Sequence, residues 1–482
     1  MMNTKTVLAV DLGAESGRVM AVHFDGAEFA LEELHRFPNG AVEIHGTLYW
    51  DFLRLWSNIR QGIEQGRNLD PASIGVDTWG VDFGLLDKND QLLGNPVCYR
   101  DNRTEGMMER AFARVPKEEI FGRTGIQFMR INTLYQLLSL VESGSAQLEA
   151  AQTFLTAPDL LNYWLTGEKA NEYTIASTTQ MLDAQSKGWA KALLAKLGIP
   201  THIFPKVVEP GTKLGAFDGI PVIAPACHDT GSAVAATPAE TVDFGYISSG
   251  TWSLVGLETN QPYLGPEALV ANITNEGGVN GRIRLLKNVT GMWLLQQCRA
   301  TWQNAGRDYS YGELVTLAEA APTLKSFINP NEPQFLVPGD YPALVRDFCA
   351  GSGQPVPEDD GSVVRIILES LAMEYRRIFD RLAALTGNQI EVIHIFGGGS
   401  QNQLLNQMTA NATGRLVVAG PVEATVLGNA LVQLIAIGEL SSLQEARQIV
   451  AQSGQLTRFE PRDVTAWEDA FGRYEKIRQA AG

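Results

Sequence analysis

The sequence predicts an α/β protein with two large domains, and three observations support this prediction. The chain has 482 residues, more than one hydrophobic core usually supports. Residues 391–438 alternate between strand and helix patterns, which is the order of α/β folds. Two stretches, 6–24 and 244–258, share a pattern of apolar strand, small polar turn and apolar strand. Internal duplication explains this recurrence, and two unrelated hairpins would explain it almost as well.

Composition and charge narrow the class of protein. A hydrophobic fraction of 45% with 19% charged residues is typical of soluble globular proteins. The formal net charge of -16 argues against binding to nucleic acid or anionic membrane, since both require a basic surface. The N-terminus is too short in apolar residues for a signal peptide, and no apolar run approaches a membrane-spanning length. We therefore expect a cytoplasmic protein with neither a nucleic-acid nor a membrane partner.

The cysteine and histidine residues suggest no permanent transition-metal site. The four cysteines lie far apart without a CxxC pair, which argues against both a zinc site and a disulfide framework. The six histidines show no HxxxH spacing. These features fit a reducing cytoplasm.

The first repeated stretch, TVLAVDLGAESGRVMAVHF at 6–24, predicts a strand, a glycine-containing turn and a second strand. Residues 29–37 predict a third strand. Gly13 and Gly17 would let the backbone approach a ligand, and successive amides in such a turn can bind an anion. Asp11 stands where a carboxylate can hold a metal near bound phosphates. Taken alone, the stretch is equally typical of an ordinary glycine-turn hairpin.

A glycine-rich turn follows the strand EVIHIF in the stretch 391–414. Gly397, Gly398 and Gly399 precede a predicted helix that ends at Gly414. A tight turn needs one glycine, so three indicate a ring or a phosphate lying against the backbone, beside the positive end of the helix.

The stretch VIAPACHDTGSA at 222–233 predicts a short buried strand that leads through His228, Asp229 and Thr230 into a helix. Open α/β sheets bind ligands just past the carboxyl ends of their strands, so Asp229 is a candidate for chemistry. The alternative is a carboxylate that caps the following helix. By itself the stretch favours the cap.

Other stretches carry residues suited to a polar small molecule. In SIGVDTWGVDFGLLD, at 73–87, Trp79 offers a flat face to a sugar, although a core tryptophan fits equally well. The charged loop 96–104 is either a solvated cluster or an edge that binds hydroxyls; it contains Tyr99, Arg100, Asp101 and Arg103. Asn288 is predicted at the start of a helix whose apolar residues belong to the core.

Several function classes lack their motifs. The sequence has no GxxxxGK[ST] and no GxGxxG after a strand, which excludes a P-loop or a Rossmann dinucleotide site. The tripeptide Asp82-Phe83-Gly84 has no accompanying HRD or VAIK motif, so a protein kinase is excluded. No GxSxG elbow supports a hydrolase triad at His228-Asp229.

The motifs together resemble the FGGY family of carbohydrate kinases, within the actin, Hsp70 and sugar-kinase superfamily. The resemblance rests on VDLGAESGR, CHDTGSA, SSGTWS and FGGGSQN, and it continues through VDTWGVDFGLLD, YRDNRT, ANITNEGG, LKNVTGMWLLQ and AGPVEATVLGN. It implies two ribonuclease-H-like (actin-like ATPase) domains, 1–238 and 239–482, that flank a central cleft for ATP and sugar. The first would hold the sugar, a phosphate hairpin and the catalytic carboxylate, and the second the other hairpin and the adenosine site.

The resemblance also implies an activity and residue roles. The expected reaction is ATP-dependent phosphorylation of L-rhamnulose at its 1-hydroxyl in L-rhamnose degradation, by a monomer that uses Mg2+. Asp229 would be the catalytic base, and Asp11 would face the magnesium ion through water. The expected sugar contacts are Gly80, His228, Asp229, Thr230 and Asn288. The expected ATP contacts are Ala14, Glu15, Ser16, Gly17, Arg18, Thr251, Gln296 and Gly398. Tyr99, Asp101 and Arg103 are further candidates.

Two features depart from the wider family, and alternatives to the expected activity stay open. Ala14 stands where many FGGY kinases carry threonine, which narrows the subfamily more than it weakens the function. No disulfide is implied for Cys349. The substrate could instead be L-fuculose, L-xylulose or another ketose. A non-catalytic nucleotide switch would share the phosphate hairpins but needs no sugar pocket, and a carbohydrate-binding module would leave the glycine turns without a role.

Overall fold

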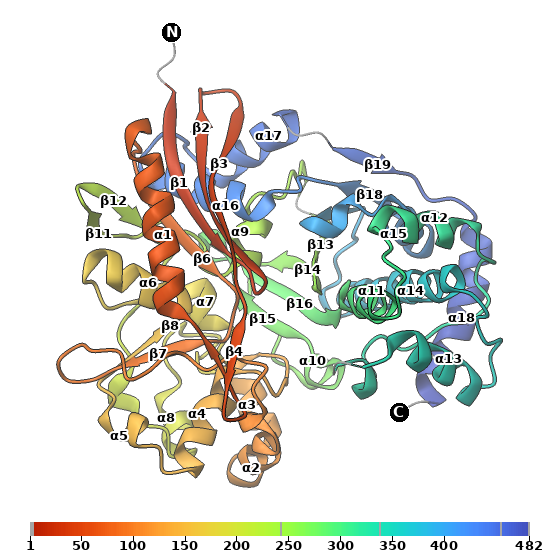
Figure 1. Ribbon diagram of the computed structural model, residues 1–482, viewed down its shortest axis with the longest axis horizontal. Coiled ribbons are helices and arrows are strands. Elements are labelled where there is room, and N and C mark those ends of the chain that lie inside the picture. Colours follow the sequence, from red (N-terminus) through yellow and green to blue (C-terminus); the bar gives the residue numbers. More distant parts are fainter. Residues whose placement is uncertain (1–3, 242, 337–338, 454–455, 481–482) are drawn as a thin grey trace. The chain divides into compact units, whose positions relative to one another are not determined.

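The fold is described from a computed structural model that covers residues 4–241, 243–336, 339–453 and 456–480 (Figure 1). It contains two compact units, each built from separate stretches of chain. Unit 1 comprises Met1–Glu240, Glu258–Leu285 and Ala424–Ser453, and unit 2 comprises Thr241–Leu257, Leu286–Glu423 and Gly454–Gly482. The predicted division of the sequence at 238/239 stays a prediction, and it differs from these units in placing both 258–285 and 424–453 in the C-terminal part.

Unit 1 is built on a six-stranded sheet with the order β11-β12-β6-β1-β2-β3. Its strands are β1 (Lys5–Leu12), β2 (Ser16–Phe24), β3 (Phe29–Pro38), β6 (Ile74–Thr78), β11 (Lys213–Phe217) and β12 (Ile220–Ile223). β1 pairs in parallel with β6 and antiparallel with β2. The strands predicted at 6–24 and 29–37 are thereby confirmed.

Helices cover both faces of this sheet, which explains why residues 7–10 of β1 are all apolar. Leu8, Val10 and Leu12 belong to a core cluster with residues of α1 and α6. The alternate residues Val7 and Ala9 are also fully buried, and α16 packs against β1, β2 and β6 (Figure 1). The helices of unit 1 are α1 (Phe52–Gly66), α2 (Met107–Arg114), α3 (Lys117–Thr124), α4 (Thr133–Glu142), α5 (Ala146–Ala150), α6 (Ala157–Thr166), α7 (Tyr173–Ser177), α8 (Lys191–Lys196), α9 (Asp229–Ala235), α10 (Pro266–Ala271), α16 (Ala424–Ala436) and α17 (Leu443–Ser453).

Short strands complete unit 1. They form the pairs β4 (Ala41–Ile44) with β5 (Thr47–Trp50), β7 (Phe83–Leu86) with β8 (Thr153–Thr156), and β9 (Asn171–Glu172) with β10 (Val207–Val208), and β15 (Thr274–Gly277) lies in the same unit. The two strands predicted within 73–87 both exist. They belong to different sheets, because β7 pairs with β8 and not with β6.

Unit 2 repeats the strand order of unit 1. Its strands lie in a seven-stranded sheet of order β15-β16-β14-β13-β17-β18-β19, in which β15 and residues 283–285 of β16 are counted with unit 1. The bounds are β13 (Phe244–Ser249), β14 (Trp252–Thr259), β16 (Ile283–Thr290), β17 (Val392–Phe396), β18 (Leu416–Ala419) and β19 (Thr457–Phe459). β13 is antiparallel to β14 and parallel to β17, β17 is parallel to β18, and β19 is antiparallel to β18. β1, β2, β6, β12 and β11 show the same relations in unit 1. This agreement favours duplication over two unrelated hairpins.

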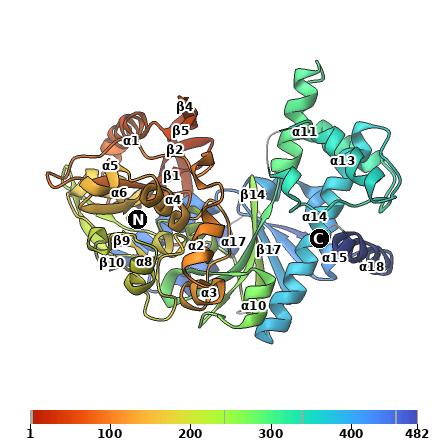
Figure 2. The same ribbon diagram turned by 90° about the horizontal axis from the view of Figure 1, so that it is seen from below.

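A 27-residue helix, α14, is the centre of the helical part of unit 2. It packs against α11, α12, α13, α15 and α18 (Figure 2). The helices are α11 (Trp293–Asn304), α12 (Tyr311–Ala320), α13 (Tyr341–Gly351), α14 (Asp360–Thr386), α15 (Gln403–Thr413) and α18 (Val464–Ala480). The alternation predicted for 391–438 is confirmed as β17, α15, β18 and α16, and Gly414 ends α15 with a left-handed φ of 65°.

The predicted position of Asn288 at a helix start is wrong. Asn288 lies inside β16, and α11 begins at Trp293. The residues IRLLKNVT keep an apolar and β-branched content typical of strands, and Gly291 then interrupts the chain before the helix.

The contact between α9 and α16 in unit 1 depends on a missing side chain. A Cβ atom added to Gly428 would lie 1.7 Å from the backbone oxygen of Ser232. Polar side chains of α16 also bind the sheet, because Gln433 Nε2 donates to the Leu8 carbonyl at 3.1 Å and Asn429 Nδ2 donates to Asp77 Oδ2 at 2.6 Å. The position of α9 on the sheet is therefore fixed by backbone contact as well as by burial.

We predict that Gly428→Ala destabilises unit 1, because the new methyl group overlaps backbone that cannot rotate away. The expected loss is about 3 kcal/mol, at the upper end of overpacking costs. Urea unfolding measures it. The matched control is Gly122→Ala on exposed α3, where an added Cβ meets nothing within 4 Å. Equal stability of the two variants would contradict the prediction.

Among the described residues, no helix has both the length and the apolar character needed to cross a membrane. The four cysteines are all buried and free of disulfide bonds.

Candidate active site

Three carboxylates lie at one edge of the unit 1 sheet. β1 and β6 are parallel, with Asp11 opposite Asp77 at their carboxyl ends. The chain after β12 joins this edge, since the Thr78 amide donates to the Cys227 carbonyl at 2.9 Å and His228 lies beside Thr78. Asp229 follows as the first residue of α9. This is the edge at which open α/β sheets bind ligands.

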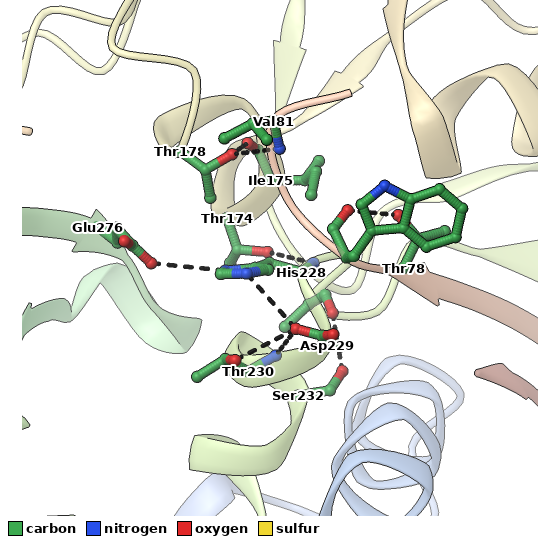
Figure 3. Close-up of polar contacts among 12 residues, drawn as sticks. Thr78, Val81, Thr174, Ile175, Thr178, His228, Asp229, Thr230, Ser232 and Glu276 are labelled. Atoms are coloured by element: carbon green, nitrogen blue, oxygen red, sulfur yellow. Dashed lines mark hydrogen bonds and ion pairs between the residues drawn. The ribbon is translucent and has the colours of Figure 1, made fainter. Parts of the chain in front are cut away.

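The Asp229 carboxylate is held through one of its two oxygens. Oδ1 accepts hydrogen bonds from the amide and from the hydroxyl of Thr230, the latter at 3.2 Å, and faces His228 Nε2 at 3.4 Å (Figure 3). Among the described residues, these contacts all fall on Oδ1, and 29% of the side-chain surface stays open. Oδ2 can therefore accept a proton from a bound molecule.

The alternative role of Asp229 as a helix cap survives only in part. His228 occupies the N-cap position of α9, without a capping bond from its side chain. Asp229 is the first helical residue and binds the adjacent Thr230 amide. It therefore satisfies one free amide of the helix end while its other oxygen stays available.

The surroundings of Asp229 favour a base that titrates near neutrality. Burial, followed by repulsion from Asp11, raises the pKa of Asp229 to about 7. The same two causes raise the pKa of Asp77 well above its usual range, opposed by the hydrogen bond from Asn429. A general base works best when its pKa lies near the operating pH.

Asp11 and Arg18 are paired with each other. Arg18 donates to Asp11 Oδ2 from Nε at 3.0 Å and from Nη2 at 2.8 Å. Sequence had assigned Asp11 to a metal and Arg18 to phosphate. Both lie at the same edge of the sheet. There the negative charge of Asp11 would face a metal ion, and the positive charge of Arg18 would face a phosphate.

The donor set at this edge fits a divalent metal ion that arrives with a phosphate ligand. Within the described ranges, no three histidine, cysteine or acidic side chains gather into a cage for a metal. Magnesium sites commonly use one or two carboxylates together with phosphates and water. Asp11 supplies such a carboxylate, and the buried Oδ1 of Asp77 has no hydrogen-bond partner, so it can accept from a metal-bound water.

The turn between β1 and β2 is held by its own backbone and by Asn39. The Gly13 amide donates to the Ser16 carbonyl at 2.9 Å, and Asn39 Nδ2 donates to the Gly13 carbonyl at 2.7 Å. Gly17 leaves no room for a side chain, because an added Cβ would lie 2.3 Å from the Phe37 ring, and the expected contact of its backbone with phosphate stays a prediction. Ala14, Glu15 and Ser16 retain exposed surface, as the phosphate-contact prediction requires.

Gly80, one of the expected sugar contacts, lies next to His228. An added Cβ would lie 3.4 Å from His228 Nε2 and 3.3 Å from Thr178 Oγ1. Four of the five expected sugar-contact residues, Gly80, His228, Asp229 and Thr230, are therefore gathered in unit 1. Asn288 lies in unit 2.

The other sugar-site candidates are buried or partly buried and are bonded to other groups of the protein. Trp79 is only 5% exposed, and its Nε1 donates to Asp82 Oδ2 at 2.9 Å. The loop 96–104 is not a solvated cluster, because Asp101 is buried and accepts from the Leu48 amide. Arg103 donates to the Gln136 side chain at 2.6 Å. Asp101 and Arg103 therefore make hydrogen bonds within the protein.

In unit 2, the turn between β13 and β14 brings two expected ATP contacts together. Gln296 Nε2 donates to Thr251 Oγ1 at 3.4 Å. The Gly250 amide donates to the Trp252 carbonyl at 2.9 Å, as Gly13 does to Ser16 in the first turn. The Thr251 carbonyl accepts from the backbone just before and at the start of α11. The turn and the helix that carries Gln296 are thus one rigid element.

Each of the three positions after β17 requires glycine, or tolerates it, for a different structural reason. Gly397 has a φ of 82°, which favours glycine, and a Cβ on Gly399 would lie 2.0 Å from Ser249 Oγ. A Cβ on Gly398 would meet nothing within 4 Å. Backbone conformation explains Gly397 and close packing explains Gly399. Only Gly398, which is exposed, still needs a ligand to explain it.

Sequence reasoning missed several groups that support the site. Asp77 ends an apolar run just as Asp11 does, and that shared signal could have identified it. Glu172 accepts from the Cys227 amide at 3.0 Å and from Thr174 Oγ1 at 2.6 Å, and the same hydroxyl accepts from the His228 amide at 3.3 Å. Burial raises the pKa of Glu172 to about 7. No local sequence pattern predicts the contact between Glu172 and Cys227, because the two residues lie 55 positions apart.

Comparison with known proteins agrees with this geometry. The N-terminal domain of the FGGY family of carbohydrate kinases matches residues 6–223, and its C-terminal domain matches 245–437. The chain belongs to this family. It therefore phosphorylates a carbohydrate with ATP, which implies a divalent metal ion.

Individual relatives cover nearly the whole kinase. It is 46% identical to a rhamnulokinase of Bacteroides thetaiotaomicron over 96% of this chain and 97% of that protein. It is 42% identical to a rhamnulokinase of Pectobacterium atrosepticum over 99% and 97%. Its fold matches a gluconate kinase of Lactobacillus acidophilus with a TM-score of 0.81 at 18% identity, covering 99% of this chain and 98% of that one. A xylulose kinase of Rhodospirillum rubrum matches with a TM-score of 0.80 at 18% identity, covering 99% of both chains. The predicted two-domain actin-like fold is confirmed.

We predict that kcat/KM of the kinase for its sugar rises with pH through about 7 and then levels off. A carboxylate can act as a base only when it is ionised, and burial, followed by repulsion from Asp11, raises the pKa of Asp229 to about 7, so this group stays protonated well above its ordinary value of 3.8. Rates measured from about pH 5.5 to about pH 8.5 test this limb. Glu43→Gln on the exposed strand β4 should leave the midpoint unchanged. A flat profile in the parent enzyme would contradict the assignment.

Proposed function

We propose that this kinase transfers the γ-phosphoryl group of ATP to the 1-hydroxyl of L-rhamnulose, giving L-rhamnulose 1-phosphate and ADP. The observation that supports L-rhamnulose as the substrate is the full-length similarity to rhamnulokinases, at 42–46% identity. The gathering of Gly80, His228, Asp229 and Thr230 in unit 1 supports the same proposal, since these are the expected sugar contacts. Asn288 would add a contact from unit 2.

Asp229 acts as the general base in this proposal. Its free Oδ2 accepts the proton as the sugar oxygen forms its bond to the γ-phosphorus and the bond to the β,γ-bridging oxygen breaks. The fixed Oδ1 keeps the carboxylate oriented, so the hydroxyl is held in line with the phosphoryl group. Since the transition state of phosphoryl transfer is loose, positioning and charge neutralisation contribute most of the catalysis.

Mg2+ and the expected ATP-contact residues balance the charge on the phosphates. Mg2+, held through water by Asp11 and Asp77, would neutralise charge on the phosphate oxygens when bound. The turn 13–18, including Ala14, Glu15, Ser16, Gly17 and Arg18, contacts phosphate through its amides and through Arg18. Thr251 and Gln296 hold ATP from unit 2, and the exposed Gly398 lies against the adenosine. The cytoplasm, which supplies ATP and keeps cysteines reduced, is the proposed compartment.

We predict that Asp229→Asn lowers kcat by about 10³-fold, within the usual contribution of a general base. ATP affinity, measured by calorimetry, should change little, because the phosphate and adenosine contacts remain. Asp51→Asn is the matched control, since Asp51 caps α1 and asparagine caps a helix equally well. Near-normal turnover of the Asp229 variant would refute the role of base.

We also predict that L-rhamnulose gives the highest kcat/KM in a panel with L-fuculose and L-xylulose. A site built to hydrogen-bond specific hydroxyls discriminates against epimers, because unpaired polar groups are left buried. A coupled assay of ADP release measures the ratios. A higher value for another ketose would change the substrate but keep the chemistry. ADP release that does not depend on any sugar would favour a nucleotide switch.

A further inference from the structure

A buried ion pair lies behind His228, on the side away from Asp229. Arg284 of β16 has no exposed side-chain surface, and its Nη1 lies 3.2 Å from Oε2 of Glu276, on β15. Arg284 Nε donates to the Gly277 carbonyl at 2.7 Å, and Nη2 lies 2.9 Å from His228 Nδ1. The Glu276 carboxylate is 3.5 Å from the same nitrogen of His228 (Figure 3). All of these residues belong to unit 1.

The contact with Arg284 fixes where the proton of His228 resides. A guanidinium group has only donors and stays charged in proteins. At 2.9 Å, Nδ1 must therefore accept, which requires a neutral ring that carries its proton on Nε2. Burial, followed by the charge of Arg284, lowers the pKa of His228 well below its usual value, in agreement with a neutral ring.

The protonated nitrogen faces the proposed sugar site. Nε2 lies 3.4 Å from Asp229 Oδ1, and a Cβ added to Gly80 would lie 3.4 Å from the same nitrogen. Resting on the function proposed above, we propose that Arg284, held by Glu276, is a positioning residue that fixes His228 as the neutral Nε2–H tautomer. His228 then donates to Asp229 or to a sugar oxygen and never accepts from a sugar hydroxyl.

Other charged groups near His228 do not reverse this assignment. Glu172 is reached only through Thr174, whose hydroxyl accepts from the His228 amide and donates to Glu172. Asp11 acts on Asp229, which faces Nε2 and favours a proton there. Tyr173, on α7, packs against Gly277, and burial raises its pKa, so it stays neutral. The groups that contact the ring directly are Asp229, Glu276 and Arg284.

Removal of Arg284 should reverse the tautomer. In Arg284→Met, the Glu276 carboxylate would be left beside Nδ1 and would favour a proton on that nitrogen by accepting a hydrogen bond from it. A neutral His228 would then present a bare Nε2, and only the doubly protonated ring would still donate to the sugar. The donor would therefore disappear as pH rises through the new pKa of His228.

The first test is spectroscopic and needs no activity. In the full chain labelled with 15N-histidine, long-range proton–nitrogen spectra distinguish the two tautomers and the protonated ring. The chain has six histidines, and the loss of one signal set in His228→Gln assigns the residue. We expect an Nε2–H, Nδ1-acceptor pattern at neutral pH in the unmodified protein. An Nδ1–H pattern or a protonated ring there would overturn the proposal.

The second test compares pH profiles. The kcat/KM of Arg284→Met for the sugar, divided by that of the parent enzyme, should fall about tenfold as pH rises from about 6 to about 8.5, the contribution of one hydrogen bond. A merely structural role predicts a ratio that does not change with pH, and that result would overturn the proposal. If the variant does not fold, the spectra of the parent protein still decide.

The double variant Arg284→Met with Glu276→Gln is the matched control. The carboxamide can donate to Nδ1, so the Nε2–H tautomer and a pH-independent ratio should return. A slope that persists in the double variant would overturn the role of Glu276. If the parent enzyme phosphorylated no ketose, the proposed function would fail, while the tautomer spectra would still test this inference separately.

Discussion

The site depends on the parallel pairing of β1 with β6. This pairing places Asp11 opposite Asp77, and the amide of Thr78 then holds the chain that leads to Asp229. Burial, followed by repulsion from Asp11, raises the pKa values of Asp77 and Asp229 at this edge. A cation relieves this repulsion, so an arrangement that is costly in the empty protein favours a metal–nucleotide complex.

Buried polar groups beneath this edge keep it rigid. Glu172 accepts hydrogen bonds from the Cys227 amide, just before His228, and from the Thr174 amide of α7. Asn429 and Gln433 bind α16 to the sheet. Such groups are stable in the interior only when their partners are in place. At Gly428 the backbones of α9 and α16 are in such close contact that no side chain fits between them. The catalytic turn is therefore supported from below by hydrogen bonds and from the side by close packing.

The hairpins and the turn after β17 were predictable because each combines a local period with turn residues. The strand order of each unit was not read from the sequence, yet the duplication that it reveals was already suggested by the two similar hairpins. Asn288 was misplaced because a strand ending in Asn-Val-Thr next to Gly291 mimics a helix start. Trp79 could not be assigned, since an aromatic residue beside a glycine has the same local pattern in a core as in a sugar site.

By itself, the sequence determined the family, the glycine turns and the candidate base Asp229, since these depend on short stretches of chain. Tertiary structure decided which oxygen of Asp229 is held, which of the three glycines is open, and which nitrogen of His228 carries the proton. The last of these depends on a contact between residues 56 positions apart. Local patterns fix backbone conformation, whereas protonation and orientation depend on groups that only folding brings within hydrogen-bond distance.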